Sequence, residues 1–587
     1  MTADSAERSS EPSRLAKAVP MLGWLPSYDR SWLSVDVLAG LTLWGLVVPE
    51  AMAYAGIAGL PPQAGLYTLV AALLLYALFG TSRHLVVGAT SASAALLASS
   101  VTEALVATGA ASDAETYQAY AAAFVLLTGL IFLAAGLAKL GFITQFLSKP
   151  VMDGFVLGLA VFVAVGQLYK IFGVPKPEGN TIEKFFGTIQ ELPQTNWVTF
   201  AIGAGSLVLL FLLPRLNKKI PGGLVVLFGS IAMSMALGLE ANYGVEVVGE
   251  LPQGLPTLSL PQVPLAAYFS MILPAIGVFL VAFSEGLGVA HEFAEKHGYE
   301  VDADQELNAN AFANLGSALF GGMIAGGSMS ASAVKEGSGA RSQVANLVTW
   351  AATILTLLFL TPLFAPLPEA VLGALIIHAV WHIIISRKLY KLRQASRVEF
   401  WFGVLAFLGV IFIDVFEGMI IGLVASLLFV LYKTSRPHIA SLGRVPDARG
   451  AYTDINRHPE NIPVPGVLIM RFDSQIYYAN ALTVRDTVKA MVEEMDPPPQ
   501  IVIMDAEAQE EIDVTSTDVI NGLVKELHGK GIDIYMADVH APVLEYGRQT
   551  GLVDAIGEEK IFATLDLAVK AAGAAVSEAP PEAASAE

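Results

Sequence analysis

The chain has 587 residues, of which 54% are hydrophobic and only 15% are charged, and its mean hydropathy is +0.58. Soluble domains carry about 25% charged residues, so a water-soluble protein of this size is excluded. The sequence contains no cysteine, which excludes a disulfide scaffold, cysteine-based metal sites and thiol catalysis. A net charge of −19 argues against a nucleic-acid partner, and a polytopic membrane protein is the class that remains.

Acidic residues are concentrated in the last quarter of the chain. From Ala440 onward there are 25 acidic and 11 basic residues, a composition typical of a soluble domain that follows an apolar one. The first residues are polar and lack the pattern of a signal peptide. We predict five parts: a cytoplasmic N-terminal segment at 1–31, a transmembrane domain at 32–436, a linker at 437–461, a soluble domain at 462–573 and a disordered tail at 574–587.

Fourteen apolar segments lie in the predicted transmembrane domain, and each marks a candidate span of the lipid bilayer. Two of them are too short to cross about 30 Å of hydrocarbon as straight helices. The segments are 35–56, 64–80, 88–107, 117–138, 150–171, 196–213, 222–238, 267–290, 307–321, 329–337, 343–361, 369–386, 399–414 and 416–433.

The basic residues follow the positive-inside rule if the N-terminus is cytoplasmic. The five basic residues between positions 387 and 397 then lie in an inner loop, and Lys335 is also expected at the inner surface. One outer loop departs from the rule, with Lys170, Lys176 and Lys184 around it. We therefore predict a multi-pass protein of the cell (inner) membrane with both termini in the cytoplasm.

Two spans are interrupted by small residues at matching places in the two halves of the domain. The third span opens with Gly80–Ser93 and the tenth with Gly321–Ser332, so each is the third of seven. Such pairs suggest half-helices that meet at the membrane midplane of an inverted repeat. Two helix N-termini facing one another would form an anion site without a basic side chain. The alternative is that small residues only permit close helix packing.

Several of these motifs resemble those of the SulP family of anion permeases. They are Val48–Tyr67, Gly80–His84 and Asp302–Leu307, which leads to Asn314 and to Phe320-Gly-Gly322, and the tail from Val467 resembles a STAS domain. The resemblance implies fourteen spans in two inverted seven-span repeats, at about 35–240 and 265–435. It also implies a core that carries the anion, a gate that dimerises, and an elevator-like movement of the core.

The resemblance further implies which residues bind the anion. Many family members have Gln at the position of Glu50 and Arg at the position of Ala331, so the pocket of this chain is less positive, which does not favour simple chloride binding. An acidic position of the family matches Glu285 in the eighth span. The expected substrate-binding residues are Glu50 and Tyr54 of the first span, Ala89 and Thr90 of the third, and Ser328, Met329 and Ser330 of the tenth.

Glu50 and Glu285 are the two ionisable residues most directly tied to transport. Charges inside spans are costly and usually functional, so we expect them to bind the coupling proton or sodium ion; a structural hydrogen-bonding role is the alternative. Tyr54 could also be an aromatic packing residue. His378 and His382 are spaced as a helical metal pair, but no third ligand is evident, and we expect neither a metal nor a cofactor.

The soluble tail alternates strands and helices, which indicates an α/β domain with a sheet covered on one face. Asp513, Thr515 and Ser516 lie where a strand passes into a helix. In stand-alone STAS proteins this loop carries a phosphorylatable hydroxyl, so the resemblance implies a regulatory role, with helix capping as the alternative. No nucleotide-binding loop is present, which argues against ATP-driven transport.

We predict a secondary active transporter rather than an enzyme. The expected substrate is an inorganic anion, with sulfate first and bicarbonate or a C4-dicarboxylate as alternatives. A carboxyl at Glu50 would repel a bound anion unless it takes up a proton, so we expect H⁺ symport, with sodium coupling as the alternative. Also expected are a homodimer and a possible cytoplasmic partner at the STAS domain. A membrane sensor or scaffold without transport and, less favoured, an ion channel are the competing hypotheses.

Overall fold

The structure is a computed structural model, and it divides into two compact units. We call Met1–Ser426 the helical unit and Leu427–Glu587 the C-terminal unit. Parts of the predicted N-terminal segment and tail, at 1–17 and 579–587, lie outside the described residues. The described residues are 18–142, 148–177, 179–216, 222–386, 388–446, 448 and 450–578.

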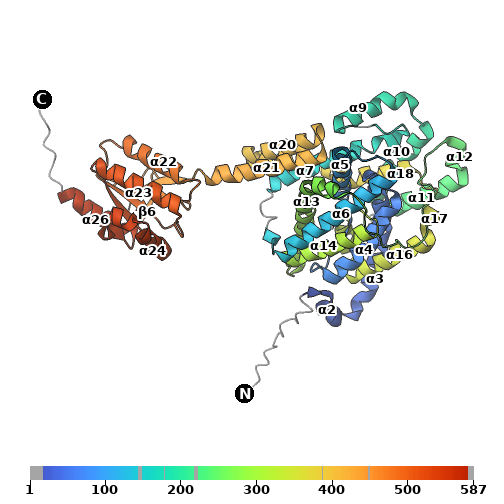
Figure 1. Ribbon diagram of the computed structural model, residues 1–587, viewed down its shortest axis with the longest axis horizontal. Helices are drawn as coiled ribbons and strands as arrows, with labels where there is room; N and C mark the ends of the chain where they lie inside the picture. The colour runs from blue at the N-terminus through green and yellow to red at the C-terminus, as the bar shows by residue number, and fades with distance from the viewer. Residues whose placement is uncertain are drawn as a thin grey trace, which may run out of the picture. The chain divides into compact units, whose positions relative to one another are not determined.

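A helix lies at each of the fourteen predicted spans (Figure 1). Among the described residues, ten helices are long and apolar enough to cross a membrane, and Gly222–Leu237 is a shorter apolar helix. The helices are α3 (Leu33–Ile57), α4 (Pro62–Phe79), α5 (Ser91–Thr108), α6 (Ala114–Leu137), α7 (Lys149–Val165), α10 (Trp197–Leu216), α11 (Gly222–Leu237), α13 (Leu265–His297), α14 (Ala303–Leu319), α15 (Met329–Gly337), α16 (Val344–Leu355) with α17 (Thr361–Phe364), α18 (Glu369–Ile384), α20 (Arg397–Phe412) and α21 (Val415–Thr434).

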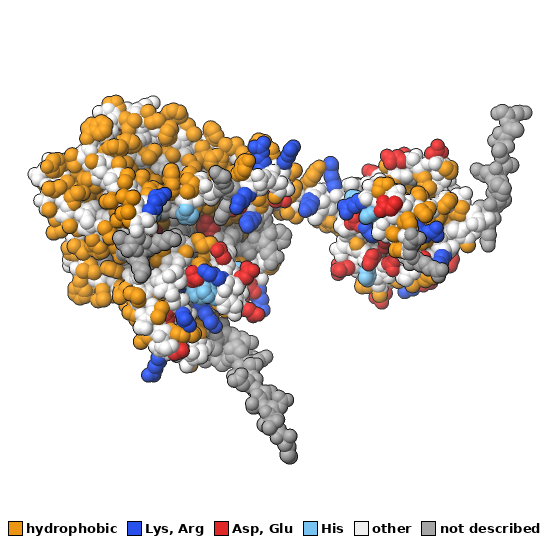
Figure 2. All heavy atoms as spheres, turned by 180° about the vertical axis from the view of Figure 1, so that it is seen from behind, with side chains coloured by type: hydrophobic (Ala, Val, Ile, Leu, Met, Phe, Trp, Pro, Cys, Tyr) orange, Lys and Arg blue, Asp and Glu red, His pale blue; other side chains and the backbone are white. Residues whose placement is uncertain are grey.

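Apolar side chains cover much of the surface of the helical unit, as Figure 2 shows. Large apolar side chains such as Leu209, Phe269, Leu273, Trp401 and Leu405 are exposed there. Water-soluble proteins rarely expose apolar surface on this scale, whereas lipid tails solvate it. The surface therefore agrees with the predicted membrane domain.

Two three-residue strands pair at the centre of the interrupted spans. Strand β1 (Val87–Ala89) runs antiparallel to β2 (Ala325–Gly327), with Gly88 opposite Gly326. A hydrogen bond of 2.9 Å from the Ser328 N–H to the Val86 carbonyl extends the pairing. Helix α5 follows β1 and α15 follows β2, so each broken span is a strand and a helix in sequence. The sequence predicts the interruption but not the strands.

Helix α14 supplies the hydrogen bonds that this two-stranded ribbon cannot make by itself. The Asn314 amide accepts from the Ala325 N–H at 2.9 Å and donates to the Ala325 carbonyl at 3.0 Å. Thr68 of α4 accepts from the Met323 N–H at 2.7 Å, and Ser317 donates to the Met323 carbonyl. The outer edge of β2 is therefore satisfied by side chains, as buried backbone in a membrane domain requires.

The residues that lead into β1 donate hydrogen bonds to one buried carboxylate. Glu306 of α14 is 1% exposed and accepts hydrogen bonds from the Thr81 N–H and hydroxyl, both at 2.7 Å. It also accepts from the Ser82 N–H at 3.2 Å and from the Tyr76 hydroxyl at 2.8 Å. The resembling motifs at 80–84 and 302–307 thus meet in space and fix the loop that leads into β1.

The C-terminal unit is a six-stranded sheet with helices on both faces. Its strand order is β4-β3-β5-β6-β7-β8, and β5 to β8 are parallel. The bounds are β3 (Ile439–Arg444), β4 (Tyr452–Asp454), β5 (Val467–Phe472), α22 (Ala481–Glu494), β6 (Ile501–Asp505), α23 (Val514–Gly529), β7 (Asp533–Ala537), α24 (Ala541–Gln549), α25 (Leu552–Ile556), β8 (Ile561–Phe562) and α26 (Leu565–Glu578).

The prediction of a sheet covered on one face is wrong. Leu468 and Met470 of β5 pack with α22, α23 and α25, whereas the alternate residues Val467 and Ile469 pack with Ala568 and Ala572 of α26. Successive strand residues point to opposite faces, so a strand that is apolar at every position needs a cover on each side. Helix α26 also occupies the start of the predicted tail.

Replacing Asn314 with leucine should destabilise the protein, because Asn314→Leu leaves the buried N–H and carbonyl of Ala325 without partners. We expect a loss of about 2–4 kcal/mol in the free energy of unfolding, measured as a lower apparent melting temperature in detergent. Asn310→Leu is the matched control, since Asn310 is one turn earlier and also buried, and within the described chain its amide donates only to the Glu306 carbonyl of the same helix. Equal stability of the two variants would contradict this role of Asn314.

Candidate functional site

The two helices that follow the ribbon begin in the same way. Thr90 precedes α5, and its hydroxyl accepts from the Ser93 N–H at 3.2 Å and donates to the Ser93 hydroxyl at 2.9 Å. Ser328 precedes α15, and its hydroxyl accepts from the Ala331 N–H at 3.3 Å and lies 3.2 Å from the Ser330 hydroxyl. Both residues are N-caps in extended conformation. Both residues were predicted to bind a ligand; the spacing of the small polar residues that follow them could also have indicated their capping role.

Capping leaves the first two N–H groups of each helix available. An α-helix provides no internal acceptor for its first four N–H groups, and the caps satisfy only the third. In the described part of the chain, no acceptor binds the N–H groups of Ser91 and Ala92 in α5 or of Met329 and Ser330 in α15. The strands are antiparallel and each helix continues its strand, so the positive ends of both helix dipoles face the ribbon.

Helix α13 crosses the ribbon at a contact between two glycines. A Cβ atom added to Gly327 would lie 2.5 Å from the Cα atom of Gly286, so only glycine permits this approach. Glu285 is the residue before Gly286 and is therefore next to the start of α15. The neighbouring Ser284 hydroxyl is buried and has no hydrogen-bond partner among the described residues.

Glu50 and Tyr54 lie one turn apart on α3, which contacts both β1 and α5. Tyr54 is 6% exposed, and its hydroxyl lies in the electrostatic field of Glu50. Pro49 has no N–H and so breaks the hydrogen-bond ladder of α3 immediately before Glu50. Within the described ranges, neither Glu50 nor Glu285 forms a hydrogen bond or an ion pair, so both carboxyl groups are open to a ligand or a proton.

A cavity of about 780 Å³ reaches this region between α7 and α13. We call it the Glu285 cavity. Ser284, Glu285 and Met329 line one part of it, and Lys139 and Lys149, at the end of α6 and the start of α7, line another. The free start of α15 can therefore be reached from the end of the helical unit where α6 ends. Met329, one of the predicted substrate-binding residues, therefore lines a cavity that leads to this helix start.

The expectation that Lys335 lies at the inner surface is wrong. Its side chain is fully buried, and its ammonium group donates to the Arg83 carbonyl at 3.0 Å. The positive-inside rule predicted the inner surface, but the segment that precedes β1 folds over the end of α15 and covers the side chain. Asp36 contributes compensating negative charge, and its carboxylate accepts from the Arg341 N–H and the Ser342 hydroxyl.

The predicted regulatory residues lie at the start of α23 in the C-terminal unit. Asp513 is the N-cap and accepts from the Ser516 N–H at 2.9 Å and from the Tyr478 N–H at 2.7 Å. Ser516 is fully buried, whereas Thr515 is exposed. The geometry supports the capping alternative for Asp513 and leaves Thr515 as the accessible hydroxyl. Over the residues that the structure describes, no group of three metal-ligating side chains occurs, at His378 and His382 or elsewhere.

Comparisons with known proteins identify the family. Residues 33–406 match the sulfate permease family, and residues 458–568 match the STAS domain. The chain is 35% identical over 559 residues to a probable sulfate transporter of Mycobacterium tuberculosis, covering 94% of this chain and 98% of the relative. It is 34% identical over 500 residues to human solute carrier family 26 member 6, covering 81% and 65%.

Solved structures share the fold. A structure of the murine solute carrier 26 family member A9 anion transporter in the inward-facing state superposes with a TM-score of 0.86 at 25% identity, covering 98% of this chain and 97% of the other. The transmembrane domain of the cyanobacterial bicarbonate transporter BicA gives 0.59 at 22% identity, covering 68% and 98%.

The protein is a multi-pass membrane transporter with a fourteen-span helical domain of two inverted repeats and a STAS domain. The chain belongs to the sulfate permease family, whose members transport anions.

Proposed function

We propose that the protein is a secondary active transporter of inorganic anions, and that the anion binds between the N-termini of α5 and α15. The observation that carries this proposal is the β1–β2 ribbon, which turns two helix dipoles toward one place. The first turns of both helices contain no basic side chain, so four backbone N–H groups would be the main ligands.

Sulfate is the substrate we favour. Its two negative charges gain more from paired helix dipoles than a single charge does, and the mycobacterial relative is described as a probable sulfate transporter. Bicarbonate and C4-dicarboxylates are the alternatives, and a bicarbonate transporter is among the structural neighbours. Backbone N–H groups bind any of these oxygens, so the ribbon by itself does not select among them.

We propose that α5, α13 and α15 move together with the anion against α7, α20 and α21. The Glu285 cavity separates α7 from α13, which gives the movement a boundary. The Ser99 hydroxyl of α5 donates to the Asp414 carboxylate, between α20 and α21, at 3.0 Å. This bond crosses the same boundary, so an elevator movement would have to break it.

The membrane orientation that we propose has the Glu285 cavity open to the cytoplasm. Lys139 and Lys149 line that cavity, and the positive-inside rule assigns such residues to the cytoplasmic face of the inner membrane. Both termini would then be cytoplasmic. In this arrangement the STAS domain would regulate transport through a cytoplasmic partner or modification near Thr515, and the helical domains would pair in a homodimer.

Uptake of radiolabelled sulfate into proteoliposomes tests the proposed function. We expect uptake faster than in empty liposomes, and competition by excess unlabelled sulfate. In the same assay, the alternative substrates are ranked by how strongly excess bicarbonate, fumarate, nitrate or chloride reduces the uptake of labelled sulfate. If excess sulfate fails to compete while labelled bicarbonate is taken up, sulfate is the wrong substrate. If no anion of the panel is taken up, a membrane sensor or scaffold becomes the better account.

Proline at the first position of either helix should weaken anion binding without unfolding the protein. Ser91→Pro and Met329→Pro each remove one N–H that has no acceptor in the fold, and proline suits this position. The residues before them are extended, as proline requires. A hydrogen bond to a charged group contributes about 1.5–3 kcal/mol, so we expect sulfate affinity to fall about tenfold to a hundredfold. Equilibrium dialysis with labelled sulfate measures it.

Two further variants complete this test. Ser91→Ala keeps the N–H and should bind sulfate as the wild type does. Lys335→Met removes the buried cation, which lies about 9 Å along the helix axis from Met329, where a charge contributes about 2 kcal/mol at an effective dielectric constant of 20. Loss of all binding in Lys335→Met, with unchanged binding in Ser91→Pro, would identify the lysine rather than the helix N-termini as the main attraction.

We propose proton coupling through Glu50. Two like charges about 4 Å apart repel by about 4 kcal/mol at an effective dielectric constant of 20, so an ionised Glu50 next to the anion is unfavourable. A protonated Glu50 removes the repulsion, so proton and anion would enter together. Glu285, which is also without a partner among the described residues, is the competing proton or sodium site.

Uptake at about pH 5.5 and 7.5, which brackets the titration expected for a carboxyl group in a low-dielectric site, tests the coupling. Wild-type uptake should be faster at the lower pH, because more of the protein carries the proton. Glu50→Gln should still bind sulfate but lose the pH dependence, and Glu285→Gln should keep it. Acid stimulation that persists in Glu50→Gln would move the role to Glu285, and a strict sodium requirement would remove proton coupling.

A further inference from the structure

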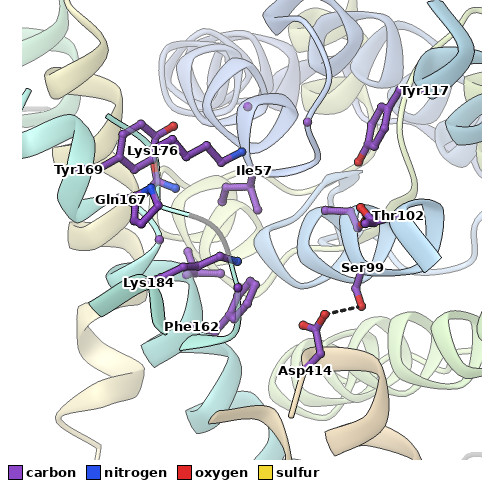
Figure 3. Close-up of a pocket in the computed structure, with 17 residues that line it drawn as sticks. Ile57, Ser99, Thr102, Tyr117, Phe162, Gln167, Tyr169, Lys176, Lys184 and Asp414 are labelled. Carbon is purple, nitrogen blue, oxygen red and sulfur yellow. Dashed lines mark hydrogen bonds between the residues drawn. The ribbon is translucent and has the colours of Figure 1, made fainter. Parts of the chain in front are cut away.

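A second cavity, of about 690 Å³, lies at the opposite end of the helical unit (Figure 3). It is lined by the end of α3, the start of α6 and the segment after α7, whereas the Glu285 cavity is lined by the end of α6 and the start of α7. We call it the Lys184 cavity. Opposite ends of α6 and of α7 line the two cavities, so the cavities open on opposite faces of the helical unit.

The described lining of the Lys184 cavity contains two lysines and one carboxylate. Lys184 lies in α9 (Thr181–Glu191), and Lys176 lies in the segment that follows α7. Figure 3 shows both ammonium groups extending toward the same space. Among the described lining residues Asp414 is the one carboxylate, and it accepts from the Ser99 hydroxyl and the Val415 N–H. Within the described lining, the one carboxylate is thus already hydrogen-bonded.

The position of Lys184 is fixed by its surroundings. Its ammonium group lies 4.5 Å from the centre of the Phe162 ring, a cation–π contact that keeps the charge at the cavity wall. Burial lowers the pKa of Lys184, the carboxylate of Asp414 raises it, and the positive charge of Lys176 lowers it. The fields of both neighbours thus reach this ammonium group, and an anion between the two lysines would relieve their repulsion.

The side-chain amide of Gln167 lies in the same cavity wall, and its oxygen lacks a hydrogen-bond partner among the described residues. Its side chain is 5% exposed, and its buried Oε1 atom has no hydrogen-bond partner among the described residues. A buried amide without a partner is unfavourable unless a ligand or water completes it. The two ends of an amide can exchange places, so its NH₂ group can turn to donate to an anion.

We propose that the Lys184 cavity is a second anion-binding site, in which Lys176 and Lys184 attract a small dissolved oxyanion and Gln167 donates a hydrogen bond to it. The site rests on the proposed function, because it would concentrate the transported anion at the face opposite the Glu285 cavity. It also accounts for Lys176 and Lys184, which depart from the positive-inside rule, because cations that attract the substrate are needed at this face. Lys170, the third lysine that departs from the rule, forms an ion pair with Glu369 at 2.9 Å instead.

A reporter thiol in the cavity tests binding without transport. The chain contains no cysteine, so Thr102→Cys introduces a single thiol, and position 102 lines the cavity. In phosphatidylcholine liposomes, sulfate should slow modification of this thiol by a neutral maleimide. Adding Lys184→Gln should raise the sulfate concentration for half-protection, on the order of tenfold for the loss of a focused charge. Lys391→Gln, an exposed charge in α19 (Lys388–Ala395), is the matched control.

A second variant tests the charge itself. Lys184→Cys should raise the KM for sulfate, and a cationic aminoethyl thiosulfonate should restore it, whereas an anionic sulfonatoethyl thiosulfonate should raise it further. Restoration requires a folded protein, so misfolding cannot imitate this result. Equal effects of the two reagents, or half-protection unchanged by Lys184→Gln, would overturn the proposal. Protection by phosphatidylglycerol in place of sulfate would also overturn it, since the ligand would then be a lipid headgroup.

These results are separable from the proposed function. If wild-type protein takes up no anion while sulfate protects the thiol at position 102, the transport proposal fails and the binding site stands. If uptake is normal while sulfate gives no protection, the Lys184 site fails and transport stands.

Discussion

The antiparallel pairing of β1 with β2 is the constraint on which the rest of the helical unit depends. Only three residues of each strand take part, with Gly88 opposite Gly326, yet the pairing sets where α5 and α15 begin and which way their dipoles point. Strand backbone inside a membrane domain is tolerated only when it is buried and its polar groups are bonded. Asn314, Thr68 and Ser317 supply those bonds, which explains polar side chains on otherwise apolar helices.

The ribbon also explains why the candidate site needs no basic side chain at its centre. Thr90 and Ser328 each satisfy one N–H of the helix that follows, and the two N–H groups before it stay available in both helices. The positive side chains lie farther away: Lys335 is buried in the last turn of α15, and the lysines of the two cavities lie toward opposite faces. The proposed site would attract an anion through the dipoles of both helices.

The sequence was sufficient for the positions of the spans and for the two interruptions, because long apolar runs and clusters of small residues are local signals. It was insufficient for the strands, since three residues such as Val87–Ala89 are too few to show an alternating pattern. The burial of Lys335 depends on the fold of residues 80–85, about 250 positions earlier, and no local pattern contains that contact. The Lys184 cavity likewise combines segments that are distant in sequence. The sequence by itself therefore showed only that Lys176 and Lys184 depart from the positive-inside rule.

We propose above all that the two helix N-termini share one bound anion. Anomalous scattering from crystals soaked with selenate, an analogue of sulfate, tests this directly. A selenium peak should lie within about 4 Å of the backbone nitrogens at the starts of both α5 and α15, because selenate oxygens accept N–H bonds at about 3 Å and selenium lies behind them. A peak beside Lys335, or a protein that transports sulfate with no peak between the two helix starts, would contradict it.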